Sequence, residues 1–323
     1  MTVLHIPARE VPVPAHLSPE AQGMLAMGAL SSGESPAFDD LEGWRANAIA
    51  TDQGMLPMLA AMVAGVEAAS REVDVEGVRV YEATPAGLPD GDRRVYLNLH
   101  GGGFVSGGGE CCRLMGLHAL AGSGVRTWSV DYRMPPEHPY PAALDDCLTV
   151  YRSLLVDHRP EDIIVGGGSA GGNLAAALML RARDEGLPAP AGLVLLTPEV
   201  DLTESGDSTT ANLGLDTVLT GSLMQANLLY ADGQSLTEPY LSPLFGDLTK
   251  GFPPTLLTSG TRDLFLSNTV RMHRKLRAAG VAAELHLLEA GGHAGFFGMA
   301  PEDREMTDEV RRFVDAHWTT PGA

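Results

Sequence analysis

The chain has 323 residues, of which 44% are hydrophobic and 20% charged; this composition is that of a folded globular protein and excludes a disordered one. The 41 acidic residues outnumber the 22 basic ones, and the formal net charge of −19 disfavours nucleic acid or an anionic membrane surface as a partner. The only lysines, Lys250 and Lys275, are not part of a Gly-Lys-Ser or Gly-Lys-Thr sequence, which excludes a nucleotide-binding loop of the Walker type.

The first 70 residues differ from the rest of the chain. Apolar residues recur there at helical spacing, and no run alternates as a strand does. The helices that this spacing predicts cover residues 24–30, 41–49 and 55–66. Valines then alternate with polar residues on both sides of Glu76 and Gly77, which predicts a β-hairpin. We therefore expect a helical segment over residues 1–70 and a larger domain over residues 71–323.

Beyond the hairpin, short apolar runs alternate with helical stretches. The predicted strands are residues 95–99, 125–130, 163–165, 193–196, 255–258 and 283–288. The predicted helices are residues 113–121, 142–156, 173–184, 268–279 and 303–318. This alternation predicts an α/β fold whose parallel strands carry helices on both faces. An insertion over residues 201–240 interrupts the alternation and has a helical signal of its own at residues 223–230.

The cysteines and the chain start bear on the compartment. Cys111, Cys112 and Cys147 are an odd set with two direct neighbours, which is a poor disulfide framework, so we expect reduced thiols in a cytoplasmic protein. Neither a CxxC nor an HExxH pattern is present to indicate a metal site. The first ten residues do not resemble a signal peptide, and no apolar run approaches the ~20 residues of a membrane helix.

A glycine-rich loop follows the strand at residues 163–165 and has two competing interpretations. Glycines 166, 168 and 171 match the dinucleotide fingerprint GxGxxG, whereas Gly167, Ser169 and Gly171 match the nucleophile elbow GxSxG. A dinucleotide loop usually follows the first strand of its fold, with an acidic residue about 20 positions later. This loop follows about five strands, and the next strand ends near Glu199, so its position favours the elbow.

A second glycine-rich loop, residues 100–109, follows the strand at residues 95–99. A backbone with so few Cβ atoms can point N–H groups into a cavity, as an acyl-transfer enzyme needs for the oxyanion of its tetrahedral intermediate. The loop lies where the HGGG-type motif of lipases and esterases lies. We expect His100 to hold this loop by hydrogen bonding and not to act as a base.

Three motifs in order carry a family resemblance. They are His100-Gly101-Gly102-Gly103, the segment Asp-Tyr-Arg-Met-Pro-Pro-Glu-His-Pro-Tyr-Pro-Ala-Ala at residues 131–143, and Gly168-Ser169-Ala170-Gly171-Gly172-Asn173. From about residue 70 to its end the chain resembles the hormone-sensitive-lipase-like esterases (bacterial family IV), which are α/β-hydrolases. The family commonly has an acidic residue just before the nucleophile, where this chain has Gly168. In addition, we expect Asp131 and Arg133 to form a buried pair.

The resemblance implies an eight-stranded, mostly parallel sheet with a cap made from residues 1–70 and the insertion at 201–240. It implies a nucleophile at Ser169 and oxyanion donors at the backbone N–H groups of Gly102, Gly103 and Ala170. It further implies an acid after the seventh strand and a histidine after the eighth. The sequence offers Asp263 and His293 at these places, in the order that the fold requires. Asp201 and Glu289 are alternative acids.

These observations predict a serine carboxylesterase that hydrolyses short to medium acyl esters through an acyl-enzyme, without a cofactor or a metal ion. Apolar side chains of the two helical parts are the candidates for the substrate pocket: Met24, Met27, Leu215, Val218 and Leu219. The same triad serves lactones, amides and carbamates. A non-catalytic receptor on this fold is a further alternative, although such receptors have lost the histidine that this chain has at position 293. The resemblance also implies a homodimer through the region of the eighth strand.

Overall fold

The computed structural model describes the whole chain except residues 1–3, 5–7, 9, 29–34 and 319–323. Its centre is one sheet of eight strands in the order β1-β2-β4-β3-β5-β6-β7-β8. The strands are β1 (Ala68–Val75), β2 (Val78–Pro85), β3 (Val95–Leu99), β4 (Arg126–Asp131), β5 (Ile163–Gly168), β6 (Gly192–Leu196), β7 (Thr255–Gly260) and β8 (Ala283–Leu288). Strand β2 pairs antiparallel with β1 and β4, and the other pairs are parallel. The predicted fold class is confirmed.

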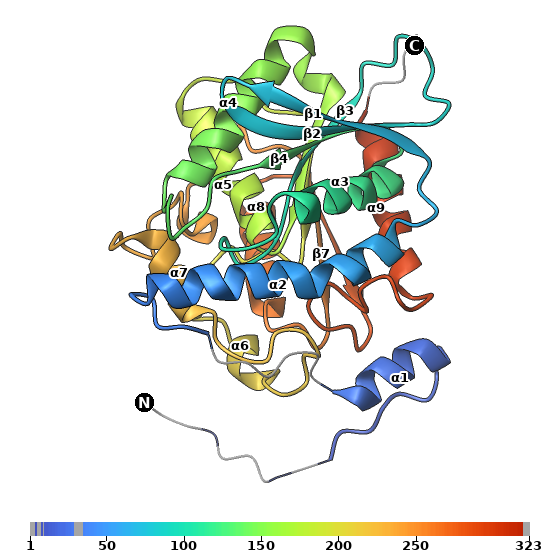
Figure 1. Ribbon diagram of the computed structural model, residues 1–323, viewed down its shortest axis with the longest axis vertical. Coiled ribbons are helices and arrows are strands. Elements are labelled where there is room, and N and C mark those ends of the chain that lie inside the picture. The colour runs from blue at the N-terminus through green and yellow to red at the C-terminus, as the bar shows by residue number, and fades with distance from the viewer. Residues whose placement is uncertain (1–3, 5–7, 9, 29–34, 319–323) are drawn as a thin grey trace.

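Helices cover both faces of the sheet (Figure 1), with α3 and α9 on one face and α4, α5 and α8 on the other. Their bounds are α3 (Glu110–Ser123), α4 (Ala142–Asp157), α5 (Ala170–Asp184), α8 (Leu266–Ala278) and α9 (Asp303–His317). Neighbouring strand residues point to opposite faces, so in β5 the side chains of Ile163 and Val165 join the larger core while Ile164 joins the smaller one. Strands that are apolar on both faces explain why the sequence reads as short apolar runs.

The remaining helices are α1 (Pro19–Met27), α2 (Leu41–Met62), α6 (Ser208–Ala211) and α7 (Met224–Ala231), and they lie together at one end of the molecule (Figure 1). Trp44 of α2 is buried against Val105, in the loop after β3, and against Ala226 and Leu229 of α7. The loop after β3 leaves the carboxyl end of that strand. The N-terminal helices and the insertion therefore meet over the carboxyl ends of the parallel strands.

Three sequence expectations are corrected in the N-terminal part. The two helices expected at 41–49 and 55–66 are parts of one helix, α2, which continues through Pro57 and ends at Met62, four residues before the expected end. Leu59 and Val63, which follows the helix, pack onto α3. The expected helix at 24–30 starts earlier, at Pro19, and ends at Met27; residues 29 and 30 lie outside the described residues. Strand β1 begins at Ala68, so the boundary expected after residue 70 falls inside a strand.

Candidate active site

Ser169 lies at the tight turn between β5 and α5. Its backbone is in the left-handed region, with φ 56° and ψ −122°, a conformation that costs a non-glycine residue on the order of 1–3 kcal/mol. The turn is held because the Ser169 N–H donates to the carbonyl of Leu196 at 2.9 Å, and the Ser169 carbonyl accepts the N–H of Glu199 at 3.2 Å. Strain at a single serine between a strand and a helix is the geometry of a nucleophile elbow.

Close packing requires glycine at three positions near this serine, Gly166, Gly167 and Gly171. A Cβ atom at Gly171 would lie 2.0 Å from the carbonyl oxygen of Leu99, and one at Gly167 would lie 2.4 Å from the carbonyl oxygen of Gly171. At Gly166 the Cβ would lie 1.8 Å from the hydroxyl of Tyr96. Close packing therefore accounts for Gly166 and Gly171 of the dinucleotide fingerprint, but not for Gly168, where a Cβ atom would lie 3.7 Å from its nearest neighbour.

The loop after β3 lies against the elbow. A Cβ atom at Gly101 would be only 3.3 Å from the Cβ of Ser169. The next residues, Gly102 and Gly103, have φ angles of 125° and 59°. Within the part of the chain that the structure describes, the N–H groups of Gly102, Gly103 and Ala170 donate to no other protein group. Unpartnered amides in the turn at Ser169 and in the loop that packs against it are suited to stabilise a developing oxyanion.

His100 stabilises this loop through contacts with Tyr132 and Gly101. Its ring stacks on Tyr132 with centroids 3.9 Å apart, and its Nδ1 lies 2.8 Å from the Gly101 carbonyl. The Tyr132 hydroxyl donates to the carbonyl of His100 at 2.7 Å. Burial lowers the pKa of His100, which favours the neutral ring. These contacts agree with a structural role for this histidine.

The expected pair between Asp131 and Arg133 is wrong. The Asp131 carboxylate accepts the N–H of Gly109 at 2.9 Å and lies 3.4 Å from the guanidinium of Arg79 on β2. Arg133 instead binds Asp146, in the first turns of α4, at 2.7 Å. Asp131 and Arg133 have other partners because β2 places Arg79 beside Asp131 and α4 places Asp146 beside Arg133.

Asp263 and His293 follow β7 and β8, so the parallel sheet brings them to the edge where Ser169 lies. Both side chains are buried, and Nδ1 of His293 lies 3.2 Å from Oδ1 of Asp263. The other oxygen of Asp263 accepts the Ser259 hydroxyl at 2.7 Å, and Oδ1 also accepts the N–H of Phe265 at 2.8 Å. The phenyl ring of Phe265 packs edge-on against the imidazole. These contacts fix the orientation of both side chains.

The alternative acids do not reach the histidine. Asp201 is buried, but its carboxylate pairs with Arg271 of α8 at 2.6 Å. Glu289 is exposed. Of the three acids that the sequence offered, only Asp263 contacts His293.

Two opposing effects act on the proton affinity of His293. Burial lowers the pKa of the imidazole, but the adjacent Asp263 carboxylate, with smaller contributions from Asp216 and Glu199, outweighs burial, and the pKa lies above its ordinary value. A buried imidazole that holds a proton readily, next to an anion that stabilises its charged form, is suited to take a proton from a neighbouring hydroxyl.

Comparison with known proteins places the chain in a family. Residues 96–297 match a family model described as alpha/beta hydrolase fold. An esterase from Acinetobacter venetianus is 36% identical over 68% of this chain and 74% of its own length. The chain belongs to the hormone-sensitive-lipase-like esterases, a family of carboxylic ester hydrolases.

Solved structures of esterases agree in fold over nearly the whole chain. The crystal structure of an esterase named E25 has 36% sequence identity and a TM-score of 0.87, and the match covers 98% of this chain and 99% of that one. An esterase from the bacterial hormone-sensitive lipase family has 30% identity and a TM-score of 0.79, covering 94% and 99% of the two chains.

Two acids of this esterase, one buried and one half-buried, escaped sequence reasoning. Glu199 is fully buried in the loop after β6, and burial raises the pKa of its carboxyl to about 8. Its Oε1 accepts Nδ2 of Asn227, on α7, at 2.9 Å. Asp52, on α2, accepts the N–H of Gly107 in the loop after β3 at 2.7 Å. An acidic residue beside an apolar strand was the only sequence signal for Glu199, and Asp52 had none.

The third such residue is Asp216 of the insertion, whose side chain is 2% exposed. It accepts the backbone N–H of His293 and of Leu264, the residue after Asp263. The N-terminal helices thus contact the loop after β3 through Asp52, and the insertion contacts the loops after β7 and β8 through Asp216.

The five candidate pocket residues separate into two groups. Met24 is packed between Leu288 and Phe296 in a small hydrophobic cluster, and Met27 is 69% exposed, so neither placement supports the expected position at a pocket. Leu215, Val218 and Leu219 are half-buried and flank Asp216 in the insertion. They remain candidates for the lining of the substrate site.

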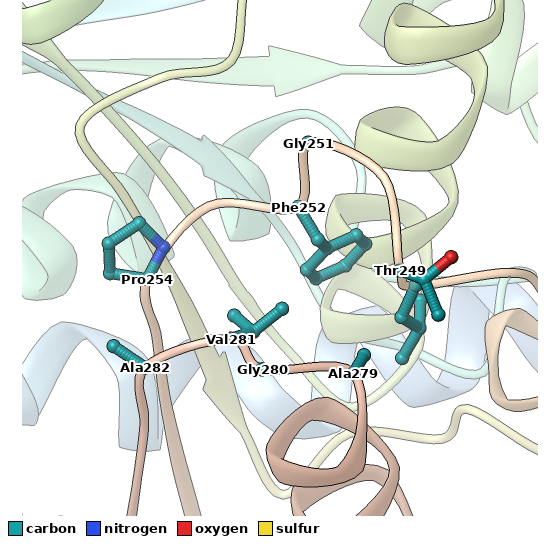
Figure 2. A pocket seen from close by; sticks show the side chains of 9 residues that line it. Thr249, Gly251, Phe252, Pro254, Ala279, Gly280, Val281 and Ala282 are labelled. Atoms are coloured by element: carbon teal, nitrogen blue, oxygen red, sulfur yellow. The ribbon is translucent and has the colours of Figure 1, made fainter.

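Two further features lie away from this constellation. Ligand atoms of His100, Cys112 and Asp131 lie within 4.8 Å of one another, but both oxygens of Asp131 are already engaged by Gly109 and Arg79. A surface pocket of about 270 Å³ (Figure 2) is lined by Phe252, Pro254, Val281 and neighbouring residues. These segments precede β7 and β8, so the pocket lies at the amino ends of the parallel strands, whereas Ser169 lies at their carboxyl ends.

Among the described residues, no helix combines the length and the apolar character needed to cross a bilayer.

Proposed function

We propose that this chain is a serine carboxylesterase that hydrolyses short to medium acyl esters, with Ser169 as nucleophile, His293 as base and Asp263 as the acid that orients the base. The observation that carries the proposal is the buried 3.2 Å contact between Asp263 and His293, at the same sheet edge as the strained Ser169. Membership of an esterase family supports the type of bond that is cleaved.

In the proposed reaction, Nε2 of His293 takes the hydroxyl proton of Ser169 as the oxygen attacks the ester carbonyl. The oxyanion of the tetrahedral intermediate accepts hydrogen bonds from the N–H groups of Gly102, Gly103 and Ala170. Collapse of the intermediate expels the alcohol, which receives its proton from His293, and leaves the acyl group on Ser169. Water, deprotonated by His293, then attacks the acyl carbonyl. Collapse of this second intermediate breaks the bond to the Ser169 oxygen, which takes the proton back from His293, and the acid is released. Throughout, Asp263 stabilises the imidazolium.

The substrate range is proposed from the cap. The half-buried side chains of Leu215, Val218 and Leu219 are apolar and precede α7 in the insertion. An apolar lining of this kind favours acyl chains over charged groups. Preference for long-chain triglyceride emulsions over soluble short-chain esters contradicts this part of the proposal.

The test is release of p-nitrophenol from p-nitrophenyl butyrate by the wild type and by Ser169→Ala, with Ser235→Ala as a control at an exposed serine of the insertion. We expect kcat to fall about 10⁴-fold or more in Ser169→Ala and to stay unchanged in the control. Turnover that survives in Ser169→Ala contradicts the proposal. Turnover by neither protein, with folding intact, moves the assignment to a hydrolase of lactones, amides or carbamates, or to a receptor.

Partners and location are also part of this proposal. The substrate is a small molecule, and the high negative charge disfavours nucleic acids and anionic membranes. All three cysteines are free and buried, which supports a reducing, cytoplasmic compartment. A homodimer through β8, an edge strand of the sheet, stays a prediction.

A further inference from the structure

Asp216 makes an unusual set of contacts for a surface insertion. Its carboxylate is buried and, among the described residues, accepts hydrogen bonds only from backbone N–H groups, two of them local: Val218 at 2.9 Å and Leu219 at 3.2 Å. The other two come from distant parts of the chain. Oδ2 accepts the N–H of Leu264 at 2.9 Å, and the N–H of His293 lies 3.1 and 3.2 Å from the two oxygens.

The two distant donors belong to the acid and to the base. Leu264 follows Asp263 directly, and the other amide is that of His293 itself. Asn212, four residues before Asp216, binds the same acid loop through the carbonyl of Asp263 at 2.9 Å. On the other side, Gly292 allows the close approach, because a Cβ there would lie 2.7 Å from Oδ1 of Asp216. One buried carboxylate therefore joins the insertion to both loops.

We infer that Asp216 is a positioning residue for the esterase reaction. It fixes the backbones at Asp263 and His293 relative to each other, and so couples the cap insertion to the acid–base pair. This inference rests on the proposed function. Displacement of a reacting group by about 1 Å is enough to cost about 10²-fold in rate, so a link that fixes both loops matters to kcat. Asp216 touches no atom that reacts.

Its negative charge has a second effect. The titratable groups that face His293 are Asp263 after β7, Asp216 in the insertion and Glu199 after β6. Burial raises the pKa of Glu199 to about 8, so this group adds negative charge only in alkaline solution, and the carboxylates of Asp263 and Asp216 favour the imidazolium that forms when Ser169 loses its proton. A group that only stabilised the fold would leave the proton affinity of His293 unchanged, so the pH profile separates the two roles.

The test compares Asp216→Asn with Asp201→Asn. An asparagine at position 216 keeps the shape but offers a single acceptor oxygen, and its NH₂ group faces N–H donors. Asp201 is the matched control, because it is a buried acid of the same insertion whose carboxylate binds Thr203, Ser205 and Arg271 and reaches neither loop. Both variants are titrated with a covalent serine reagent, so that kcat is expressed per active site.

For Asp216→Asn we expect kcat to fall about 10–100-fold with a smaller change in KM, and the acidic limb of kcat/KM to move to lower pH. For Asp201→Asn we expect a lower unfolding temperature with kcat per site and the acidic limb unchanged. Equal losses in the two variants with an unmoved limb, or full kcat in Asp216→Asn, overturn the inference.

Gly292→Ala serves if Asp216→Asn does not fold. The added methyl group would displace the Asp216 carboxylate from the His293 amide, because a Cβ at Gly292 would lie 2.7 Å from Oδ1 of Asp216. Gly292 does not have a positive φ, so alanine fits its backbone conformation, and the substitution removes no charge. We expect kcat per site to fall about tenfold or more, and an unchanged kcat overturns the inference. Ser169→Ala is run in parallel. Turnover that persists in Ser169→Ala refutes the proposed esterase mechanism and the inference with it, whereas loss in Ser169→Ala with full activity in Asp216→Asn refutes the inference alone.

Discussion

Oδ1 of Asp263 lies 3.2 Å from Nδ1 of His293, and both side chains are buried beneath the cap. The carboxylate faces the nitrogen that must carry a proton if Nε2 is to accept one from Ser169. Burial lowers the pKa of the imidazole, but Asp263, together with Asp216 and Glu199, outweighs burial, so the pKa lies above its ordinary value. In the proposed reaction, this contact favours the tautomer with a proton on Nδ1 and affects the pH range in which His293 can act as a base.

This contact predicts the pH dependence of the wild type. His293 must be neutral to accept a proton, and its pKa lies above its ordinary value, so kcat/KM should decrease as the pH falls through a limb that lies above pH ~6.5. In Asp263→Asn, kcat should fall about 10⁴-fold because the imidazole loses its orienting partner and the anion. The measurement is kcat/KM for p-nitrophenyl butyrate between pH 5 and 9. A flat profile for the wild type contradicts this role of His293.

The glycines of the elbow predict a contrast between two alanine variants. A Cβ at Gly171 would lie 2.0 Å from the Leu99 carbonyl oxygen, whereas one at Gly168 would lie 3.7 Å from the nearest atom, the carbonyl oxygen of Leu196. Gly171→Ala should lower the free energy of unfolding by about 3 kcal/mol or more and abolish turnover. Gly168→Ala should change it by less than about 1 kcal/mol. The free energy of unfolding of both variants is measured by urea denaturation. Equal decreases in the two variants contradict the difference in packing between Gly171 and Gly168.

The space around Gly168 would accept a side chain, as the resembled family commonly has at this position. The acidic residue that relatives commonly have before the nucleophile is missing here, but its absence is not required by packing, since the first atom of a side chain fits.

Glu199 predicts a dependence of stability on pH. Burial raises the pKa of this carboxyl from its usual 4.5 to about 8. Between these values the unfolded chain is ionised at this position and the folded protein is protonated, so the fold loses stability as the pH rises, by at most about 1.4 kcal/mol per pH unit. Above pH 8 both states are ionised, and this loss stops growing.

Glu199→Gln tests this directly, because the amide resembles the neutral acid and keeps the acceptor for Asn227. Its unfolding temperature should match that of the wild type near pH 4.5, exceed it by several degrees at pH 8, and keep a constant lead above that pH. Glu289→Gln, at an exposed acid, should follow the wild type at every pH. If the unfolding temperature of Glu199→Gln does not rise relative to that of the wild type between pH 5 and 8, Glu199 is ionised in the folded protein.

Much of the fold was predictable because its signals are local. Strands that are buried on both faces read as short apolar runs, and β8 occupies the predicted residues 283–288. The elbow was predictable because few residue types fit the left-handed, crowded turn at Ser169. Asp263 and His293 followed because parallel strands bring their carboxyl ends to one edge, so a residue after each strand is placed by topology alone.

The sequence by itself thus determined the fold class and the residues that follow the strands, since both depend on neighbours along the chain. Only the tertiary structure decided which charged groups meet. Asp216 and His293 are 77 residues apart in sequence, and Asp131 pairs with Arg79 in place of the nearby Arg133. Hydrogen bonds and ion pairs act over a few ångströms in space, and 41 acidic residues offer too many partners for spacing along the chain to choose among them.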